Sequence, residues 1–120
     1  TSCPVMAAVR DTDMVLLVTE PTPFGLNDLA LAVDMVRELR LTFGVIVNRM
    51  GSGDNRIQEF CEKEDIPILL EIPDDRRIAE YYSRGVLMVD ALPEYRKLFE
   101  SLLQKIRGQI GKGERKHAYL

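Results

Sequence analysis

Three short apolar runs divide the chain, and within each run the hydrophobic residues are continuous rather than alternating with polar ones. The runs are Asp13–Thr19, Phe43–Asn48 and Ile66–Ile72. Continuous runs of this length, rich in Val, Ile and Leu, are typical of strands buried on both faces, as in a parallel sheet. Pro67 lies near the start of the third run, where a missing N–H does least harm. We therefore predict three buried strands.

The stretch after the first strand carries apolar residues at helical spacing. The loop residues Pro21, Pro23 and Gly25 come first, so Asn27 is a candidate N-cap for a helix. Leu26 and Leu31 occupy the positions of a hydrophobic staple around that cap. The predicted buried stripe consists of Leu29, Ala32, Val33, Val36 and Leu39.

Two shorter helices are predicted around the first two strands. Pro4–Arg10 precedes the first strand, with a proline at the first turn. After the second strand, Gly51–Gly53 is expected to form a turn and Asp54 to cap a helix. The apolar face of that helix is Ile57, Phe60 and Cys61.

The C-terminal third is predicted to be mainly helical. Asp74 or Asp75 would cap a helix that runs to about Arg84 and stops at Gly85. Leu87–Val89 is expected to be a short extended piece. Pro93 would then open a last helix with a buried stripe of Tyr95, Leu98, Phe99, Leu102 and Ile106.

Strands that alternate with helices predict an α/β fold, a parallel sheet flanked by helices. We expect one domain over residues 1–110, followed by a basic, flexible tail at 111–120. With 120 residues and a formal net charge of −3, the composition is that of an ordinary folded domain and does not indicate nucleic-acid binding. No stretch reaches the length of a transmembrane span.

The residue types present exclude several kinds of site. Cys3 and Cys61 are far apart and form no Cys-x-x-Cys pair, so the spacing of zinc and iron–sulfur ligands is missing. We expect both thiols to be reduced, Cys61 being a core residue. The single histidine, His117, lies near the chain end, which makes a histidine-based catalytic triad untenable. The sequence contains neither a Gly-x-x-x-x-Gly-Lys-[Ser/Thr] phosphate loop nor Gly-x-Gly-x-x-Gly.

Polar residues follow each predicted strand, at the edge where parallel sheets bind ligands. The three segments are Thr19–Pro23, Asn48–Gly51 and Ile72–Asp75. Asn48 ends an apolar run, and its amide could pair with a purine edge. The alternative interpretation is that Asn48 only satisfies backbone groups of its own loop, which composition alone favours. Arg76 and Arg77 are expected to be solvated.

These segments together resemble MinD-like P-loop ATPases, and most closely the branch that carries an inserted ferredoxin module. Val18–Leu29 is similar to the segment after that family's switch region, which makes Thr19, Glu20 and Pro21 candidate switch-adjacent residues. Val45–Arg49 resembles the adenine-recognition strand, and Ile72–Asp75 resembles the loop that borders the base. Thr1–Pro4 is similar to the continuation of a switch motif.

The resemblance implies a C-terminal half of the family's domain, with nucleotide-binding residues Asn48, Arg49, Pro73, Asp74 and Asp75. The phosphate loop, the switch aspartates and the cluster cysteines would lie upstream of residue 1. ATP or ADP with Mg²⁺, and iron–sulfur clusters, are then expected only in the complete protein. This chain alone is expected to be catalytically inactive and to bind nucleotide poorly.

The resemblance also implies a cytoplasmic protein and two kinds of partner. An iron–sulfur or redox protein would interact with the complete ATPase. The first strand would lack its neighbour, so a homodimer or swapped oligomer is expected for the chain alone. The last helix is amphipathic and precedes basic residues, but we favour packing on the sheet over membrane attachment.

Two alternatives remain open. Dethiobiotin synthetase and the cobyrinic acid amidating enzymes share the fold and an Asn-Arg strand end, although residues 21–28 fit them less well. The other alternative is a stand-alone flavodoxin-like interaction domain without nucleotide, in which Asn48, Asp74 and Asp75 are only cap and turn residues.

Overall fold

The computed structural model describes residues 11–51 and 53–118, with side chains described to residue 110. Its centre is a parallel sheet of three strands in the order β1-β2-β3. The strands are β1 (Val15–Thr19), β2 (Phe43–Met50) and β3 (Ile68–Pro73). The α/β class, the parallel sheet and the three predicted strands are therefore confirmed, each within a few residues of its expected bounds.

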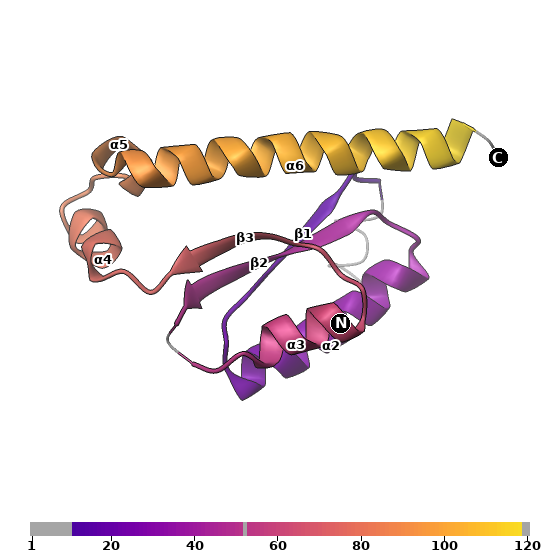
Figure 1. The fold of residues 1–120 in the computed structure, drawn as a ribbon, viewed down its shortest axis with the longest axis horizontal. Helices are drawn as coiled ribbons and strands as arrows, with labels where there is room; N and C mark the ends of the chain where they lie inside the picture. The colour runs from indigo at the N-terminus through magenta and orange to yellow at the C-terminus, as the bar shows by residue number, and fades with distance from the viewer. Residues whose placement is uncertain (1–10, 52, 119–120) are drawn as a thin grey trace.

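Helices cover both faces of this sheet. Figure 1 shows α6 along one face, α2 and α3 on the other, and α4 with α5 beyond the ends of the strands. Their bounds are α2 (Pro23–Glu38), α3 (Arg56–Lys63), α4 (Arg76–Ser83), α5 (Met88–Ala91) and α6 (Pro93–Ala118). The predicted boundary at residue 110 falls within α6. The predicted helix at residues 4–10, and Cys3, lie outside the described residues.

The core under α2 and α3 is the most deeply buried part of the described structure. Val45 and Val47 of β2 meet Leu29 and Val33 of α2 and Ile57 of α3 there, and each is 3% exposed or less. Cys61 of α3 is 1% exposed, as predicted, and burial raises the pKa of its thiol to about 11. A thiol held in this way stays protonated at neutral pH and acts as a small apolar side chain.

The opposite face is covered by the predicted stripe of α6. Leu102 packs against Ile46, Leu69 and Leu70 of the sheet, and Leu98, Phe99 and Ile106 border the same cluster. Tyr95 is 2% exposed and joins Met88 and Leu92 in a smaller cluster next to α4 and α5. The stripe predicted from the spacing of residues 95–106 is thus confirmed.

The start of α2 was predicted incorrectly. The N-cap is Thr22 rather than Asn27, and Pro23 occupies the first helical position. The Thr22 hydroxyl accepts a hydrogen bond from the Gly25 N–H at 2.9 Å. Because proline lacks an N–H and has a fixed φ, Thr22-Pro23 suits a helix start and begins the helix more than one turn earlier. The staple expected around Asn27 is therefore absent, since Leu31 is an exposed residue within the helix.

The extended piece expected at Leu87–Val89 is also wrong, because Met88–Ala91 forms the short helix α5. Met88, Leu92 and Tyr95 are buried on one side of the chain, at spacings of four and three residues. Three consecutive apolar residues cannot by themselves distinguish a strand from a helical turn. Gly85 does end the preceding helix as predicted, with a φ of 74°.

Asp54 and Asp75, two of the three aspartates considered as helix caps, accept backbone hydrogen bonds. Asp54 accepts from the Arg56 N–H at 3.1 Å, although the N-cap position itself is Asn55. Hydrogen bonding from the Arg56 side chain lowers the pKa of Asp54 to about 2. Asp75 is the N-cap of α4 and accepts from the Arg77 N–H at 2.9 Å.

Asp75 also ties the end of β3 to α6. Its carboxylate receives the Arg77 guanidinium at 2.7 Å and the Tyr95 hydroxyl at 2.7 Å, and Arg77 also contacts Glu94 at 2.8 Å. Hydrogen bonds from Arg77, and then from Tyr95, hold the pKa of the Asp75 carboxyl well below its usual range. A charged Asp75 therefore stabilises the folded chain by holding the loop after β3 in place.

The core beneath α3 gives the first prediction. Ile57→Ala removes a side chain that is 0% exposed and leaves a cavity, so we expect a loss of about 2–5 kcal/mol of unfolding free energy. The matched control is Leu103→Ala on α6, where the side chain is 53% exposed and the expected change is within about 0.5 kcal/mol. Urea denaturation measures both, and equal losses in the two variants would contradict the assigned core.

The Asp75 cluster gives the second prediction, a pH dependence. The folded pKa lies below the unfolded one, so the stabilisation is complete above the unfolded pKa of about 3.9 and decreases as pH falls from there toward the folded pKa. Asp75→Asn keeps the cap but removes the charge. We expect the variant to be less stable than wild type at pH 7, with a gap that stays constant down to about pH 5 and narrows steadily between about pH 4 and pH 2.5 without closing.

Thermal denaturation from pH 7 to 2.5 measures this gap. As a control, the effect of Asp75→Asn is also measured in a chain that carries Tyr95→Phe. Tyr95→Phe removes one of the two side-chain donors to Asp75, so the stability difference caused by Asp75→Asn should become smaller there but not vanish. If the difference in melting temperature between wild type and Asp75→Asn is the same at every pH, Asp75 does not contribute to the pH dependence of stability.

Candidate functional site

The carboxyl ends of the three strands lie at one edge of the sheet, as predicted. Thr19 of β1 is in register with Val47 of β2, and Met50 of β2 is in register with Pro73 of β3. The Asp74 N–H donates to the Met50 carbonyl at 2.9 Å, which extends the pairing of β2 and β3 into the loop. Residues that are far apart in the sequence are thereby presented together.

Arg49 connects all three strand ends. Its guanidinium contacts the Asp74 carboxylate at 3.4 Å and the Glu20 carboxylate at 3.9 Å. The Arg49 backbone is left-handed, with a φ of 55°, and the β2–β3 register shifts between Val47 and Met50. The three side chains are about half exposed, so the ion pairs add little stability, and their main effect is to set the position of the Arg49 side chain.

Asn48 is the half-buried amide at the end of the central strand. Its side-chain oxygen accepts a hydrogen bond from the Arg49 N–H at 3.0 Å, so part of the alternative interpretation, in which Asn48 serves its own loop, is correct. The Asn48 side-chain oxygen has a second lone pair, which this hydrogen bond does not use. The Asn48 amide nitrogen has no hydrogen-bond partner among the described residues. One acceptor position and two donors therefore remain for a ligand.

The end of β1 is fixed to the start of α2. The Thr19 hydroxyl, in a residue that is 7% exposed, donates to the Gly25 carbonyl at 3.1 Å. A Cβ on Gly25 would clash with the Glu20 carbonyl, so a glycine is required where the helix passes the strand end. Pro21 is buried in the same corner, against Gly53. Of the three predicted switch-adjacent residues, Thr19 and Pro21 are thus buried by structural contacts, and Glu20 is the most exposed.

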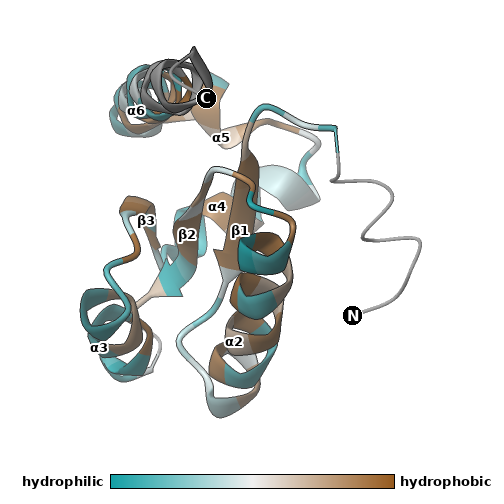
Figure 2. Ribbon diagram, turned by 90° about the vertical axis from the view of Figure 1, so that its right-hand side faces the viewer, coloured by the Kyte–Doolittle hydropathy of each residue, from teal (hydrophilic) through white to brown (hydrophobic). Residues whose placement is uncertain are grey.

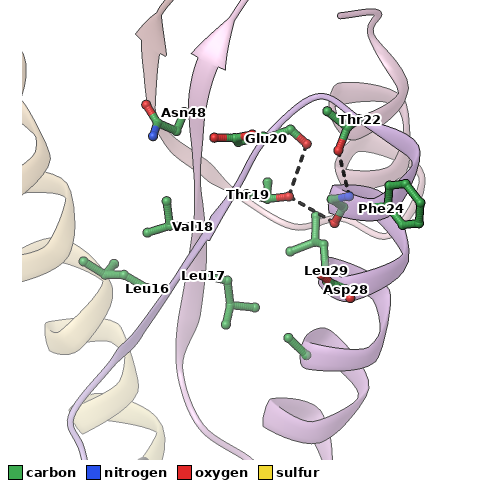
Figure 3. A pocket seen from close by; sticks show the side chains of 12 residues that line it. Leu16, Leu17, Val18, Thr19, Glu20, Thr22, Phe24, Asp28, Leu29 and Asn48 are labelled. Atoms are coloured by element: carbon green, nitrogen blue, oxygen red, sulfur yellow. Dashed lines mark hydrogen bonds between the residues drawn. The ribbon is translucent and has the colours of Figure 1, made fainter. Parts of the chain in front are cut away.

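An open hollow of about 550 Å³ runs along the outer side of β1 and the first turns of α2. Figure 3 shows Leu16 and Val18 on one side of the strand, Leu17 and Leu29 on the other, and Glu20 and Asn48 at one end. The lining is mainly apolar along the strand and polar at this end. Asn48 is the residue of β2 that reaches the hollow.

The predicted site residues therefore fall into two groups. Asn48, Glu20 and Thr19 line the hollow. Arg49, Pro73 and Asp74 lie at the same edge of the sheet but outside the lining. The Asp75 side chain points toward α6, as its bond with Tyr95 requires, so at most its backbone could contact a ligand near Asn48.

Sequence analysis did not identify two residues of the hollow, Phe24 and Asp28. Phe24 is 80% exposed and Asp28 lies one turn further along α2. Phe24 was missed because the helix was started at Asn27, which left Phe24 in a loop. The pair Thr22-Pro23, read as an N-cap and first helical residue, is the signal that would have placed Phe24 on the helix.

Other chemistry is not indicated within the part of the chain that the structure describes. No three His, Cys, Asp or Glu side chains there are grouped as metal ligands would be. Among the described helices, none is both long and apolar enough to cross a bilayer.

Comparison with known proteins adds relatives but no function. No protein-family model matches the chain. An uncharacterized protein of Methanocaldococcus jannaschii is 36% identical over 85 residues, which cover 71% of this chain and 28% of that protein. A second uncharacterized protein of the same organism is 20% identical over 105 residues, covering 88% of this chain and 36% of that protein. The chain thus spans about a third or less of the length of these curated relatives.

Proposed function

We propose that this chain is the adenine-nucleotide-binding portion of a MinD-like ATPase. The observation that supports the proposal is the gathering of three strand ends at one edge, with the Asn48 amide at the end of the most buried strand. Nucleotides bind open parallel sheets at this edge. The resemblance of residues 18–29, 45–49 and 72–75 to that family supplies the identity of the nucleotide.

Asn48 is the proposed contact to the base. One of its amide hydrogens can donate to an adenine ring nitrogen next to the exocyclic amine, while the second lone pair of its oxygen accepts from that amine. Since the Asn48 oxygen also accepts from the Arg49 N–H, its side chain is oriented before any ligand arrives. Pro73 is exposed at the end of β3, where its ring offers an apolar surface to a base, and Arg49 is placed to contact a ribose or phosphate.

Hydrolysis is proposed only for a longer protein that contains this chain. Phosphoryl transfer needs a phosphate-binding loop and Mg²⁺ ligands, and the motif of such a loop does not occur in these 120 residues. In the proposal the rest of such a protein supplies the phosphate loop, the Mg²⁺ ligands and the iron–sulfur clusters. The complete protein is proposed to be cytoplasmic and to interact with a redox partner protein. A single base contact without charge-assisted phosphate contacts gives weak binding, so millimolar affinity is expected for the chain alone.

Saturation-transfer NMR with ADP tests the proposal on the chain itself. We expect transfer to the adenine protons in wild type and a loss of most of it in Asn48→Ala. The matched control is Asn55→Ala, an exposed asparagine before α3 whose side chain makes no capping hydrogen bond. This control should retain the wild-type signal.

Three results would count against the proposal. They are no transfer to ADP in wild type, transfer in Asn48→Ala equal to that in wild type, and equal transfer to nicotinamide mononucleotide or flavin mononucleotide, which contain no adenine. The first is what the stand-alone interaction domain predicts. A parallel titration with GDP measures whether the amide discriminates between the two purines.

A further inference from the structure

We infer that Lys105 of α6 is a positioning residue for Asn48, and that it acts through the pairing of β2 with β3. The Lys105 ammonium donates a hydrogen bond to the Leu69 carbonyl of β3 at 3.1 Å. Figure 2 shows the sheet between α6 on one side and α2 with α3 on the other, so this bond joins the α6 layer to the sheet. The use of Asn48 as a base contact rests on the proposed function, whereas its conformation does not.

The register of β2 and β3 is irregular in two places that compensate each other. The pairs between the two strands are Val45 with Ile68, Ile46 with Leu70, Val47 with Glu71 and Met50 with Pro73. Leu69 is therefore an extra residue on β3 and forms a β-bulge. On β2, Asn48 and Arg49 stand opposite Ile72 alone, which makes a second bulge. The first and last pairs are equally far apart on both strands, so the second bulge restores the register that the first one shifts.

The first bulge matches the apolar residues of β3 to α6. Leu69 and Leu70 are consecutive, yet both are buried in the cluster beneath α6, and Ile72 borders the same cluster. Side chains of a regular strand alternate between the two faces. Without the bulge, Glu71 would therefore face α6 in place of Leu70 and Ile72.

The bulge leaves a backbone group that needs a partner from outside the sheet. The extra residue of a bulge is not paired in the ladder, and Leu69 is only 3% exposed. A buried carbonyl without a hydrogen bond is costly, and a charged donor is the strongest partner for it. The Lys105 ammonium is that donor, so it stabilises the bulged pairing.

The second bulge follows from the first and contains the proposed contact residue. The Asp74 N–H donates to the Met50 carbonyl at 2.9 Å, so the strands are in register again beyond this point. The extra residue of β2 must then be accommodated at Asn48 and Arg49. Arg49 adopts a left-handed φ of 55°, and its N–H donates to the Asn48 side-chain oxygen at 3.0 Å. The orientation of the Asn48 amide thus depends on the offset between the two bulges.

Regular pairing without bulges is the competing state that Lys105 disfavours. It would keep both end pairs and place Leu69 in the ladder, where its carbonyl needs no donor from α6. Asn48 would then be an ordinary ladder residue instead of being oriented by the Arg49 N–H. Removal of the Lys105 ammonium therefore favours a state in which Asn48 is not positioned.

NMR of the 120-residue chain with Lys105→Met tests the inference. Hydrogen exchange of the Val47 and Glu71 amides reports the pairing between the bulges, and the Val33 amide in the core of α2 serves as the reference. Relative to this reference, we expect both amides to exchange at least about tenfold faster in the variant, because the Leu69 carbonyl loses its donor. The signals of the Asn48 side-chain amide should shift as well.

Two further variants serve as controls. Lys105→Arg keeps a charged donor and should restore the wild-type exchange rates and signals. Lys97→Met removes a lysine from an exposed position of the same helix and should behave as wild type. The side-chain amide of Asn55, which makes no capping hydrogen bond, should keep its signals in every variant. The inference is overturned by unchanged Asn48 signals in Lys105→Met, by equal shifts in Lys97→Met, or by Lys105→Arg behaving as Lys105→Met does.

Saturation transfer to ADP separates this inference from the proposed function. We expect the transfer to fall in Lys105→Met together with the shift of the Asn48 signals, since the base contact needs an oriented amide. Shifted Asn48 signals without any transfer in wild type would reject nucleotide binding and support the role of Lys105. Transfer that Lys105→Met retains in full, with unshifted Asn48 signals, would overturn the role of Lys105 and support nucleotide binding.

Discussion

The burial of β2 on every side is the constraint on which the rest of this structure depends. Gly44, Val45, Ile46 and Val47 are all buried, with a strand on each edge and a helical layer on each face. A Cβ on Gly44 would lie 2.5 Å from the Leu69 side chain, so even the smallest side chain would force Leu69 to shift within the core. This buried segment is fixed in position, and Asn48 directly follows it.

This constraint explains which parts of the fold were predictable from sequence. The three strands could be predicted because strands buried on both faces are continuously apolar. The stripe of α6 could be predicted because its residues repeat at helical spacing. The start of α2 and the helix α5 could not, since one depends on a two-residue capping signal within a proline-rich loop and the other on contacts with Tyr95.

The candidate site was predictable to a similar depth. Topology alone brings residues 19–20, 48–49 and 73–75 to one edge, because parallel strands share a direction. The specific contacts depend on backbone geometry that no pattern encodes. Arg49 reaches both Glu20 and Asp74 only because its backbone turns left-handed where the register shifts, and Asp75 turns away because Tyr95 donates to it.

The edge of β1 and the ends of the strands are not independent surfaces. One hollow runs from Leu16 and Val18 to Glu20 and Asn48, so β1 side chains contribute to both. Val18 and Asn48 nevertheless belong to different strands, and their exposure differs, Val18 being 65% exposed and Asn48 half-buried. A loss of ADP binding in Asn48 variants that Val18 variants do not share would therefore belong to the strand ends, where Asn48 is held by the most buried strand of the sheet. The opposite pattern would belong to the apolar part of the hollow along β1.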